Sequence, residues 1–360
     1  MTILTFDETE VFESAEWKQR MSVNGDILEK NNVRQVLLVH GTFAGDDAIG
    51  LFNLLGPIEE NLTGSTFITN KLKSQGKSLL DHLAKDVGNY TPEYAEIFGK
   101  ALDQDIACKR FIWSSGDFHL ARLQGAVDLA QELADIIARK KILETERILL
   151  MGHSHAGQLF ALLTTFLENG EIAQQLYNII NKSEQLGKRD DLISNLKKIK
   201  TVNLDIVTFG TPVRYSWGEY TKYRLMAIVN HRSPVNIGGL LSTRDGDYVQ
   251  QWGAEGTDVP PPEEIELNDE LDAILDKGRD ISLLIESLKY TDRKHPHYAN
   301  GKTVSETFLV DYKDNASSLL EYLDITHCVK TLFGHGVYTE TKAMLFNTDI
   351  IIKNLYNYPG

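Results

Sequence analysis

The sequence is poor in cysteine, in positive charge and in long apolar runs. Only Cys108 and Cys328 occur in 360 residues, too few for a disulfide framework or a cysteine-built metal site, and typical of a reducing compartment. Lys and Arg number 37 against 51 Asp and Glu, and the resulting net charge of -14 repels nucleic acid and anionic membrane surfaces. No run reaches the ~18 apolar residues of a membrane span. We therefore expect neither a nucleic-acid partner nor an integral membrane segment.

The first twenty residues are acidic where a signal peptide needs a positively charged end followed by an apolar stretch. A cleaved signal is therefore not expected. The sequence favours the cytoplasm by default, and export without a cleaved signal is the alternative.

Short, continuously apolar runs alternate with helical patterns along the chain, whose composition is 42% hydrophobic and 24% charged. This alternation predicts parallel strands that are buried on both faces and joined by crossover helices, the doubly wound α/β class. Residues 123–143 have apolar positions at helical spacing and end in basic residues, which predicts a crossover helix. The expected strands are 33–40, 106–113, 147–152, 204–210, 223–230 and 303–312.

The domain organisation predicted from the sequence is one domain over residues 1–360. Three segments are longer than simple crossovers require, namely 44–105, 160–200 and 253–302. We interpret them as inserts that form lids or side layers over one sheet.

The segment 147–167 carries the strongest chemical motif, a strand, a sharp turn and a helix with Ser154 at the turn. A serine on such a turn is held with its Oγ exposed above the sheet, and the helix N-terminus adds partial positive charge beneath an attacked carbonyl. The common pattern is Gly-x-Ser-x-Gly, whereas here Gly152 is followed by Ala156 and then Gly157. The alternative interpretation is a capping serine on an ordinary turn.

This elbow, together with the earlier strand that ends in His40-Gly41-Thr42, resembles the α/β-hydrolase superfamily from about residue 33 to 355. Within that superfamily the likeness is to lipase-like serine esterases. The resemblance implies a mostly parallel central sheet flanked by helices, with helical lid or side inserts. It also implies an oxyanion hole made by the backbone amides of Thr42 and His155, and a supporting rather than catalytic role for His40.

The catalytic base implied by the resemblance is a histidine that follows the serine and the acid in the chain. His335 lies in a glycine-flanked loop between the last expected strand and a final helix, where the resemblance places the base. His231 is the second candidate. His153 and His155 flank Ser154, and we expect their side chains to point elsewhere. His295 and His297 lie in a polar turn, and one His-x-His without further ligands is weak support for a metal site.

The acid is the least determined member of the triad. Serine stands at position 233, where the resemblance would place a carboxylate after the strand 223–230. Downstream, Asp245 and Asp247 both fit the pattern, and Asp247 is favoured because two apolar residues follow it directly. Asp258 is a more distant third candidate.

These residues together predict a hydrolase of carboxylic esters, acyl lipids first, that works through a Ser154–His335–Asp247 triad and an acyl-enzyme without metal or organic cofactor. An amidase, peptidase or acyltransferase would use the same triad on another acyl group. The alternative from a different class is a catalytically inactive interaction module, for which Ser233 is the only support.

Overall fold

A computed structural model describes residues 3–41, 89–183, 186–231, 246–247, 250, 260–275, 297–299, 302–313 and 334–356 of the chain. Within these residues, seven parallel strands form one sheet in the order β1-β9-β6-β5-β4-β2-β3. Their bounds are Ile3–Thr5 (β1), Val33–Val39 (β2), Ala107–Phe111 (β3), Arg147–His153 (β4), Asn203–Phe209 (β5), Tyr223–Asn230 (β6) and Glu306–Asp311 (β9). The strands β7 (Tyr298–Ala299) and β8 (Lys302–Thr303) form a separate antiparallel pair. The α/β class expected from the sequence is confirmed.

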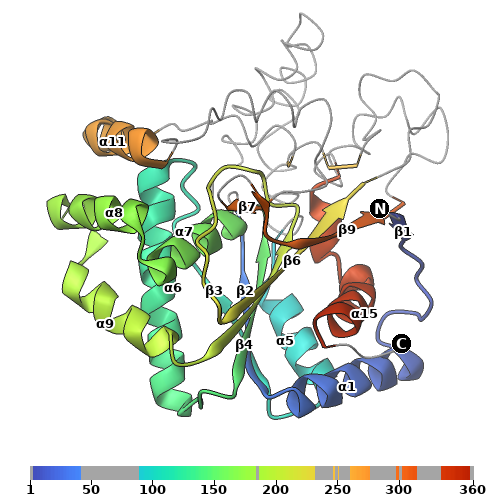
Figure 1. The fold of residues 1–360 in the computed structure, drawn as a ribbon. Helices are drawn as coiled ribbons and strands as arrows, with labels where there is room; N and C mark the ends of the chain where they lie inside the picture. Colours follow the sequence, from blue (N-terminus) through green and yellow to red (C-terminus); the bar gives the residue numbers. More distant parts are fainter. Residues whose placement is uncertain are drawn as a thin grey trace, which may run out of the picture.

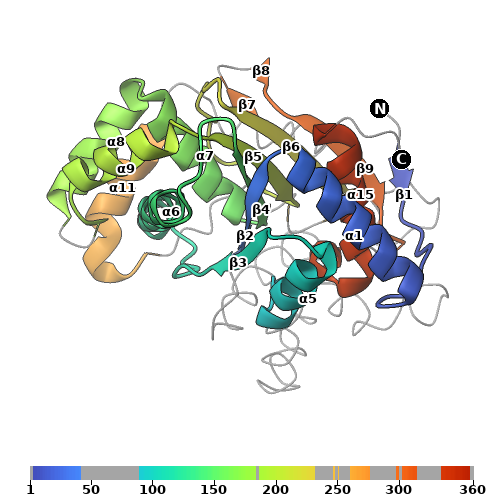
Figure 2. The same cartoon turned by 90° about the horizontal axis from the view of Figure 1, so that it is seen from below.

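Helices cover both faces of the sheet, so the described chain has three layers (Figures 1 and 2). One group contains α6 (His119–Lys140), α7 (Ala156–Glu168), α8 (Glu171–Lys182), α9 (Arg189–Ile199) and α11 (Ile265–Leu275). The other contains α1 (Ala15–Lys30), α5 (Pro92–Leu102) and α15 (Met344–Leu355). Short 3-10 helices span Pro262–Glu264 (η2), Gly336–Thr339 (η3) and Thr341–Ala343 (η4). No helix in the described ranges is long and apolar enough to cross a membrane.

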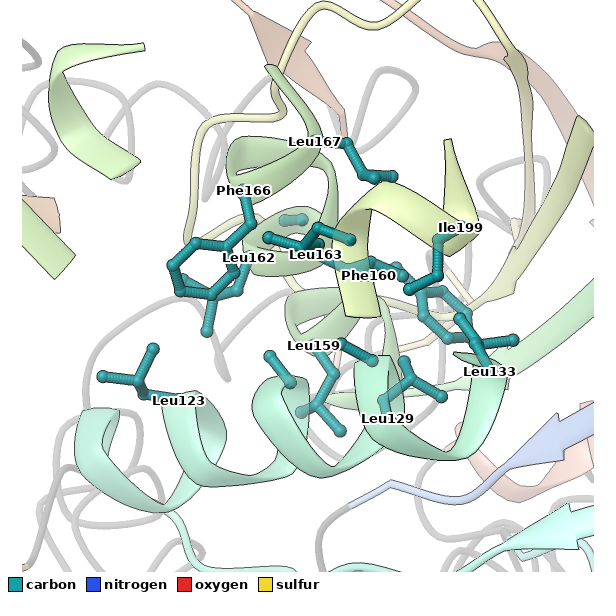
Figure 3. Close-up of a cluster of buried hydrophobic side chains, with 14 of the residues drawn as sticks. Leu123, Leu129, Leu133, Leu159, Phe160, Leu162, Leu163, Phe166, Leu167 and Ile199 are labelled. Atoms are coloured by element: carbon teal, nitrogen blue, oxygen red, sulfur yellow. The ribbon is translucent and has the colours of Figure 1, made fainter. Parts of the chain in front are cut away.

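Alternate residues of the central strands pack into two separate hydrophobic cores. In β2, Leu37 and Val39 belong to the core beneath α6 and α7, whereas Val36 and Leu38 belong to the core beneath α1 and α15. Burial on both faces explains why residues 36–39 of β2 form a continuous apolar run rather than an alternating pattern. Figure 3 shows the first core, where leucines of α6 face Leu159 and Leu163 of α7.

The expected inserts correspond only partly to described structure. Residues 160–200 begin inside α7, the crossover helix between β4 and β5, and continue through α8 and α9, which pack in the core that α6 and α7 share. Of residues 44–105, the described end contains α5, and of 253–302 the described parts contain η2, α11 and β7. The remainder of both segments lies outside the described residues.

The strand order reverses between β2 and β4. The chain passes from β2 to the edge strand β3 and then returns over β2 to β4, with α5 on one face and α6 and α7 on the other. In open α/β sheets, ligands bind in the crevice beyond the carboxyl ends of the strands at such a reversal. Two candidate residues follow these strand ends, Gly41 after β2 and Ser154 after β4.

Candidate active site

Ser154 occupies the turn between β4 and α7 in a left-handed conformation, with φ at +55°. This region is unfavourable for a residue with a Cβ, and holding it costs on the order of 1–3 kcal/mol. Two hydrogen bonds fix the turn: the Ser154 N–H donates to the Phe209 carbonyl at 2.8 Å, and Thr211 Oγ1 donates to the Ser154 carbonyl at 2.9 Å. A strained serine between a strand and a helix is the geometry of a nucleophile elbow.

Glycines surround this turn because nothing larger fits. A Cβ at position 41 would lie 2.6 Å from Ser154 Cβ, and one at position 157 would lie 2.2 Å from Thr211 Oγ1. At position 152 the clash would be with the Phe160 ring at 2.4 Å. Steric crowding therefore accounts for the glycines of the motif, and Gly41 is a further close neighbour of the serine.

Ser154 is buried, with 3% of its surface exposed, so the expectation of an exposed serine is wrong. The Gly41 backbone lies against the Ser154 side chain. The neighbouring His153 and His155 are also buried. These contacts explain why the side chain is not open to solvent at the tip of the turn.

His335 and Asp247 form a buried pair, with Nδ1 of the imidazole 2.7 Å from Asp247 Oδ2. The carboxylate also accepts the Tyr338 hydroxyl at Oδ2, at 2.9 Å, and the Gln250 N–H at Oδ1, at 2.8 Å. A carboxylate at Nδ1 favours the imidazole tautomer with its proton there, which leaves a lone pair on Nε2. Within the described residues Nε2 has no hydrogen-bond partner, so Ser154 Oγ is not hydrogen-bonded to it in this structure.

Asn230, the last residue of β6, organises both members of this pair. Its carbonyl accepts the Asp247 N–H at 3.2 Å, and its own N–H donates to the Tyr338 hydroxyl at 2.7 Å. Its side-chain amide donates to the Gly334 carbonyl at 2.9 Å, directly before His335. One strand end therefore anchors the carboxylate, the loop that carries the histidine, and the tyrosine between them.

His153, the last residue of β4, connects this strand to the loop that carries His335, contrary to the expectation that its side chain points elsewhere. Its Nε2 lies 2.8 Å from the His335 carbonyl oxygen, and the two imidazole rings are 4.4 Å apart between centroids. Since Ser154 follows His153 directly, this contact brings the serine and the histidine–aspartate pair into one region. His155 instead lies with Nδ1 3.6 Å from Asp117 Oδ1.

His40 supports the loop after β2, as expected. Its Nε2 accepts the Trp113 N–H at 3.3 Å, and its carbonyl accepts the Trp113 indole N–H at 2.8 Å. Burial lowers the pKa of His40, which keeps the ring neutral. His40 thereby ties the end of β2 to the end of β3 and fixes the position of Gly41.

A buried polar network adjoins the elbow on the α6 side. Asp117 forms an ion pair with Arg122, whose guanidinium donates to the Tyr215 hydroxyl at 3.1 Å. That hydroxyl lies 2.7 Å from His119 Nδ1, and His119 Nε2 lies 3.0 Å from Asp272 Oδ1 in α11. Burial of such charges is tolerated because they are paired, so the network fixes the surroundings of the elbow at some cost in desolvation.

His297 has a structural role. It is fully buried, with Nε2 3.0 Å from Thr208 Oγ1 and Nδ1 2.9 Å from Ser305 Oγ. Burial lowers its pKa to about 3. In the described part of the chain, no group of three or more His, Cys, Asp or Glu side chains is arranged to hold a metal ion.

Several sequence-based candidates lie outside the described residues: Thr42, Ser233, Asp245, Asp258 and His295. Of the two backbone amides expected to form an oxyanion hole, only that of His155 is described, and His155 is the N-cap of α7. His231 follows β6 and donates its N–H to the Val310 carbonyl at 2.8 Å. Among the candidate acids and bases, the structure places Asp247 with His335.

A large cavity of about 960 Å³ lies elsewhere, lined by residues of α1, α15 and β9 such as Ile27, Phe308 and Ile350. None of the candidate catalytic residues that the structure describes lines it. Its walls are mainly apolar, and the described residues that line it include no histidine.

The chain matches no family model, no curated protein and no solved structure. Its function is therefore inferred from the geometry of the site and from the motif resemblance.

Proposed function

We propose that the protein is a serine hydrolase that cleaves carboxylic esters through Ser154, His335 and Asp247. The observation that supports this most is the strained Ser154 at the strand-order reversal, next to a buried histidine–aspartate pair. The three residues also follow one another in the chain order Ser, Asp, His that α/β-hydrolases use. Strain at a single serine whose surroundings hold it in place is the kind of feature that collects at active sites.

In the proposed mechanism, His335 Nε2 removes the proton from Ser154 Oγ as that oxygen attacks the acyl carbonyl carbon. Asp247 holds the Nδ1 proton and stabilises the imidazolium that forms. His335 then transfers the proton to the leaving alcohol, and the acyl group remains on Ser154. A water molecule, deprotonated by His335, attacks the acyl-enzyme and releases the carboxylic acid and the free serine.

The tetrahedral oxyanion would be stabilised by the backbone amides of His155 and Thr42, the donors that the resemblance implies. The position of His155 at the N-terminal end of α7 supports the first assignment, since this end carries partial positive charge. Removing one such donor typically costs about 3–4 kcal/mol of transition-state stabilisation.

The proposed substrates are acyl esters, lipids first, because the His-Gly-Thr and Gly-Thr-Pro segments resemble those of lipase-like esterases. The competing proposals keep the same triad. An amidase or peptidase would attack an amide bond instead of an ester, and an acyltransferase would transfer the acyl group to an alcohol instead of water. A catalytically inactive interaction module is the further alternative. The intact His335–Asp247 pair argues against that alternative, because a module without activity has no need to keep it.

Labelling with a fluorophosphonate probe tests the nucleophile directly. We expect the parent protein to be labelled at Ser154, Ser154→Ala to lose both labelling and ester hydrolysis, and His335→Ala to lose on the order of 10⁴-fold or more in turnover, since nucleophile and base act as a unit. Hydrolysis within tenfold of the parent in Ser154→Ala would refute the assignment. If His231→Ala were the damaging change instead, the base would be misplaced.

A substrate panel then separates the competing chemistries. Initial rates on p-nitrophenyl esters of increasing chain length, on phospholipids and on matched p-nitroanilides, with Ser154→Ala as control, are expected to favour the esters. A preference for anilides would indicate an amidase or peptidase. Product formed only when an acceptor alcohol is added would indicate an acyltransferase.

A further inference from the structure

The contacts of the Tyr338 hydroxyl determine which atom accepts its proton. Its oxygen already accepts the Asn230 N–H at 2.7 Å, and 2.9 Å away lies Asp247 Oδ2. A backbone N–H can only donate, and the carboxylate that faces His335 is an acceptor. The Tyr338 O–H therefore donates to Asp247.

That donation reaches the same oxygen that His335 uses. Asp247 Oδ2 accepts from the Tyr338 hydroxyl at 2.9 Å and from His335 Nδ1 at 2.7 Å, while Oδ1 accepts the Gln250 N–H. Two donors on one carboxylate oxygen share its negative charge. The hydrogen bond from Tyr338 therefore weakens the electrostatic stabilisation that Asp247 gives to the imidazolium of His335.

The surrounding packing leaves Tyr338 little freedom. The side chain is completely buried, and its ring lies 5.4 Å from that of Tyr312 and 5.7 Å from that of His153, between centroids. A Cβ at Gly210 would lie 2.5 Å from both the Tyr338 ring and Asp247 Oδ2, so the chain closes tightly around this contact. Burial, and secondarily the neighbouring Asp247, raise the pKa of the Tyr338 phenol well above its usual range, so it stays a donor.

We infer that Tyr338 is a positioning residue of the active site, which orients the Asp247 carboxylate and limits how strongly that carboxylate stabilises the protonated form of His335. This inference rests on the proposed hydrolase function for its effect on turnover, but not for its effect on the His335–Asp247 pair. Among the described residues, the titratable groups packed around the pair are His153 at the end of β4, His231 after β6, Tyr312 after β9 and Tyr338 itself.

The test is Tyr338→Phe, which removes the hydroxyl and keeps the ring. With one donor fewer, Asp247 stabilises the His335 imidazolium more strongly, so the pKa of His335 rises. Loss of one hydrogen bond of ordinary strength corresponds to a shift of roughly 0.5–1 pH unit. We expect the acidic limb of the kcat/KM profile to move to higher pH by that amount, and the plateau to fall about tenfold as Asp247 loses an anchor.

Tyr312→Phe is the matched control. It removes another buried hydroxyl of the same aromatic cluster, one that donates to Asn347 Oδ1 at 2.6 Å rather than to Asp247. The acidic limb of the kcat/KM profile of Tyr312→Phe should lie at the same pH as in the parent. The complementary change is 3-fluorotyrosine at position 338, which keeps the ring and strengthens the donor because its phenol is more acidic. This variant should move the acidic limb of the kcat/KM profile to lower pH. It tests the positioning role even if Tyr338→Phe does not fold.

The pKa of the His335 imidazole, measured by NMR titration of ¹⁵N-labelled protein, gives the same readout without any substrate. If the parent has no hydrolase activity but Tyr338→Phe still raises this pKa, the hydrolase proposal fails and the positioning role stands. An unchanged pKa and limb in Tyr338→Phe, or an equal shift in Tyr312→Phe, would overturn the positioning role while leaving the hydrolase proposal intact.

Discussion

Gly41 lies against Ser154 so closely that a Cβ at position 41 would be 2.6 Å from Ser154 Cβ and 3.2 Å from its Oγ. The two residues follow β2 and β4, the strands between which the order of the sheet reverses. The glycine thus allows two strand ends to converge on one side chain. The closeness also makes the serine sensitive to a single methyl group placed 113 positions earlier in the chain.

Gly41→Ala should therefore damage activity more than stability. The added methyl would have to displace the Ser154 side chain, which must approach His335 in the proposed mechanism, and overpacking of this kind typically costs about 1–3 kcal/mol of unfolding free energy. We expect a loss of at least about 100-fold in kcat/KM for ester hydrolysis, because a displacement of about 1 Å at a reacting group is enough for that. Gly170→Ala is the control, since a Cβ there has its nearest neighbour at 3.6 Å. Parent-like activity in folded Gly41→Ala would show that the contact is unimportant.

Asp247→Asn should lower turnover by up to about 10⁴-fold. The amide can hold the imidazole of His335 in the wrong tautomer, and it does not stabilise the imidazolium. Asp245→Asn is expected to change turnover by less than about tenfold. The measurement is kcat on one p-nitrophenyl ester for both variants, and a reversed pair of effects would assign the acid to Asp245.

Asp205→Asn separates catalysis from the general cost of changing a buried carboxylate. Asp205 is as buried as Asp247, but it lies in β5 near the amino ends of the strands, where it binds Arg147, Arg224 and Tyr356. Breaking such a buried group of charges costs about 3–5 kcal/mol of stability. The folded fraction of Asp205→Asn should keep the kcat of the parent, whereas that of Asp247→Asn should not.

The sequence was sufficient to predict most strands of the sheet and the turn that carries Ser154, because local patterns carry this information. The apolar runs predicted all the strands from β2 to β6 and β9, and the central strands β2, β4, β5 and β6 were the clearest because burial on both faces leaves them few polar positions. Ser154 was found for a similar reason, since the small residues around it are required by contacts within a few residues or with one neighbouring strand. The short β1 and the helix α1 were not predicted, as neither pattern stands out before residue 33.

The surroundings of the site could not be predicted, because they depend on contacts between distant segments. Asn230 and Tyr338 are 108 positions apart and carry no motif, yet their hydrogen bond sets the direction of the Tyr338 hydroxyl. The contact between His153 and the His335 carbonyl joins residues 182 positions apart. The choice of Asp247 from adjacent apolar residues was a local argument, and the pairing that supports it, with His335, spans 88 positions.

His297 provides a prediction on stability rather than activity. It is fully buried between Thr208 and Ser305, and burial lowers its pKa from 6.5 to about 3. The folded protein therefore keeps this imidazole neutral at pH values where the unfolded chain already protonates it. The stability associated with the neutral ring is fully present above pH 6.5 and is lost as the pH falls from 6.5 towards 3.

In that window His297 alone should reduce the unfolding free energy by about 1.4 kcal/mol per pH unit. Urea unfolding of the parent at pH 7.5, 6.0 and 5.0 should show this slope, added to that of other buried groups such as His40, whose lowered pKa acts in the same direction. His297→Gln keeps a polar group near Thr208 and cannot be protonated, so it should be less stable at pH 7.5 but lose less stability on acidification. Equal slopes for the parent and His297→Gln would mean that the ring is protonated in the folded state. The difference in slope is the quantity to measure, because it cancels the contribution of every group that the two proteins share.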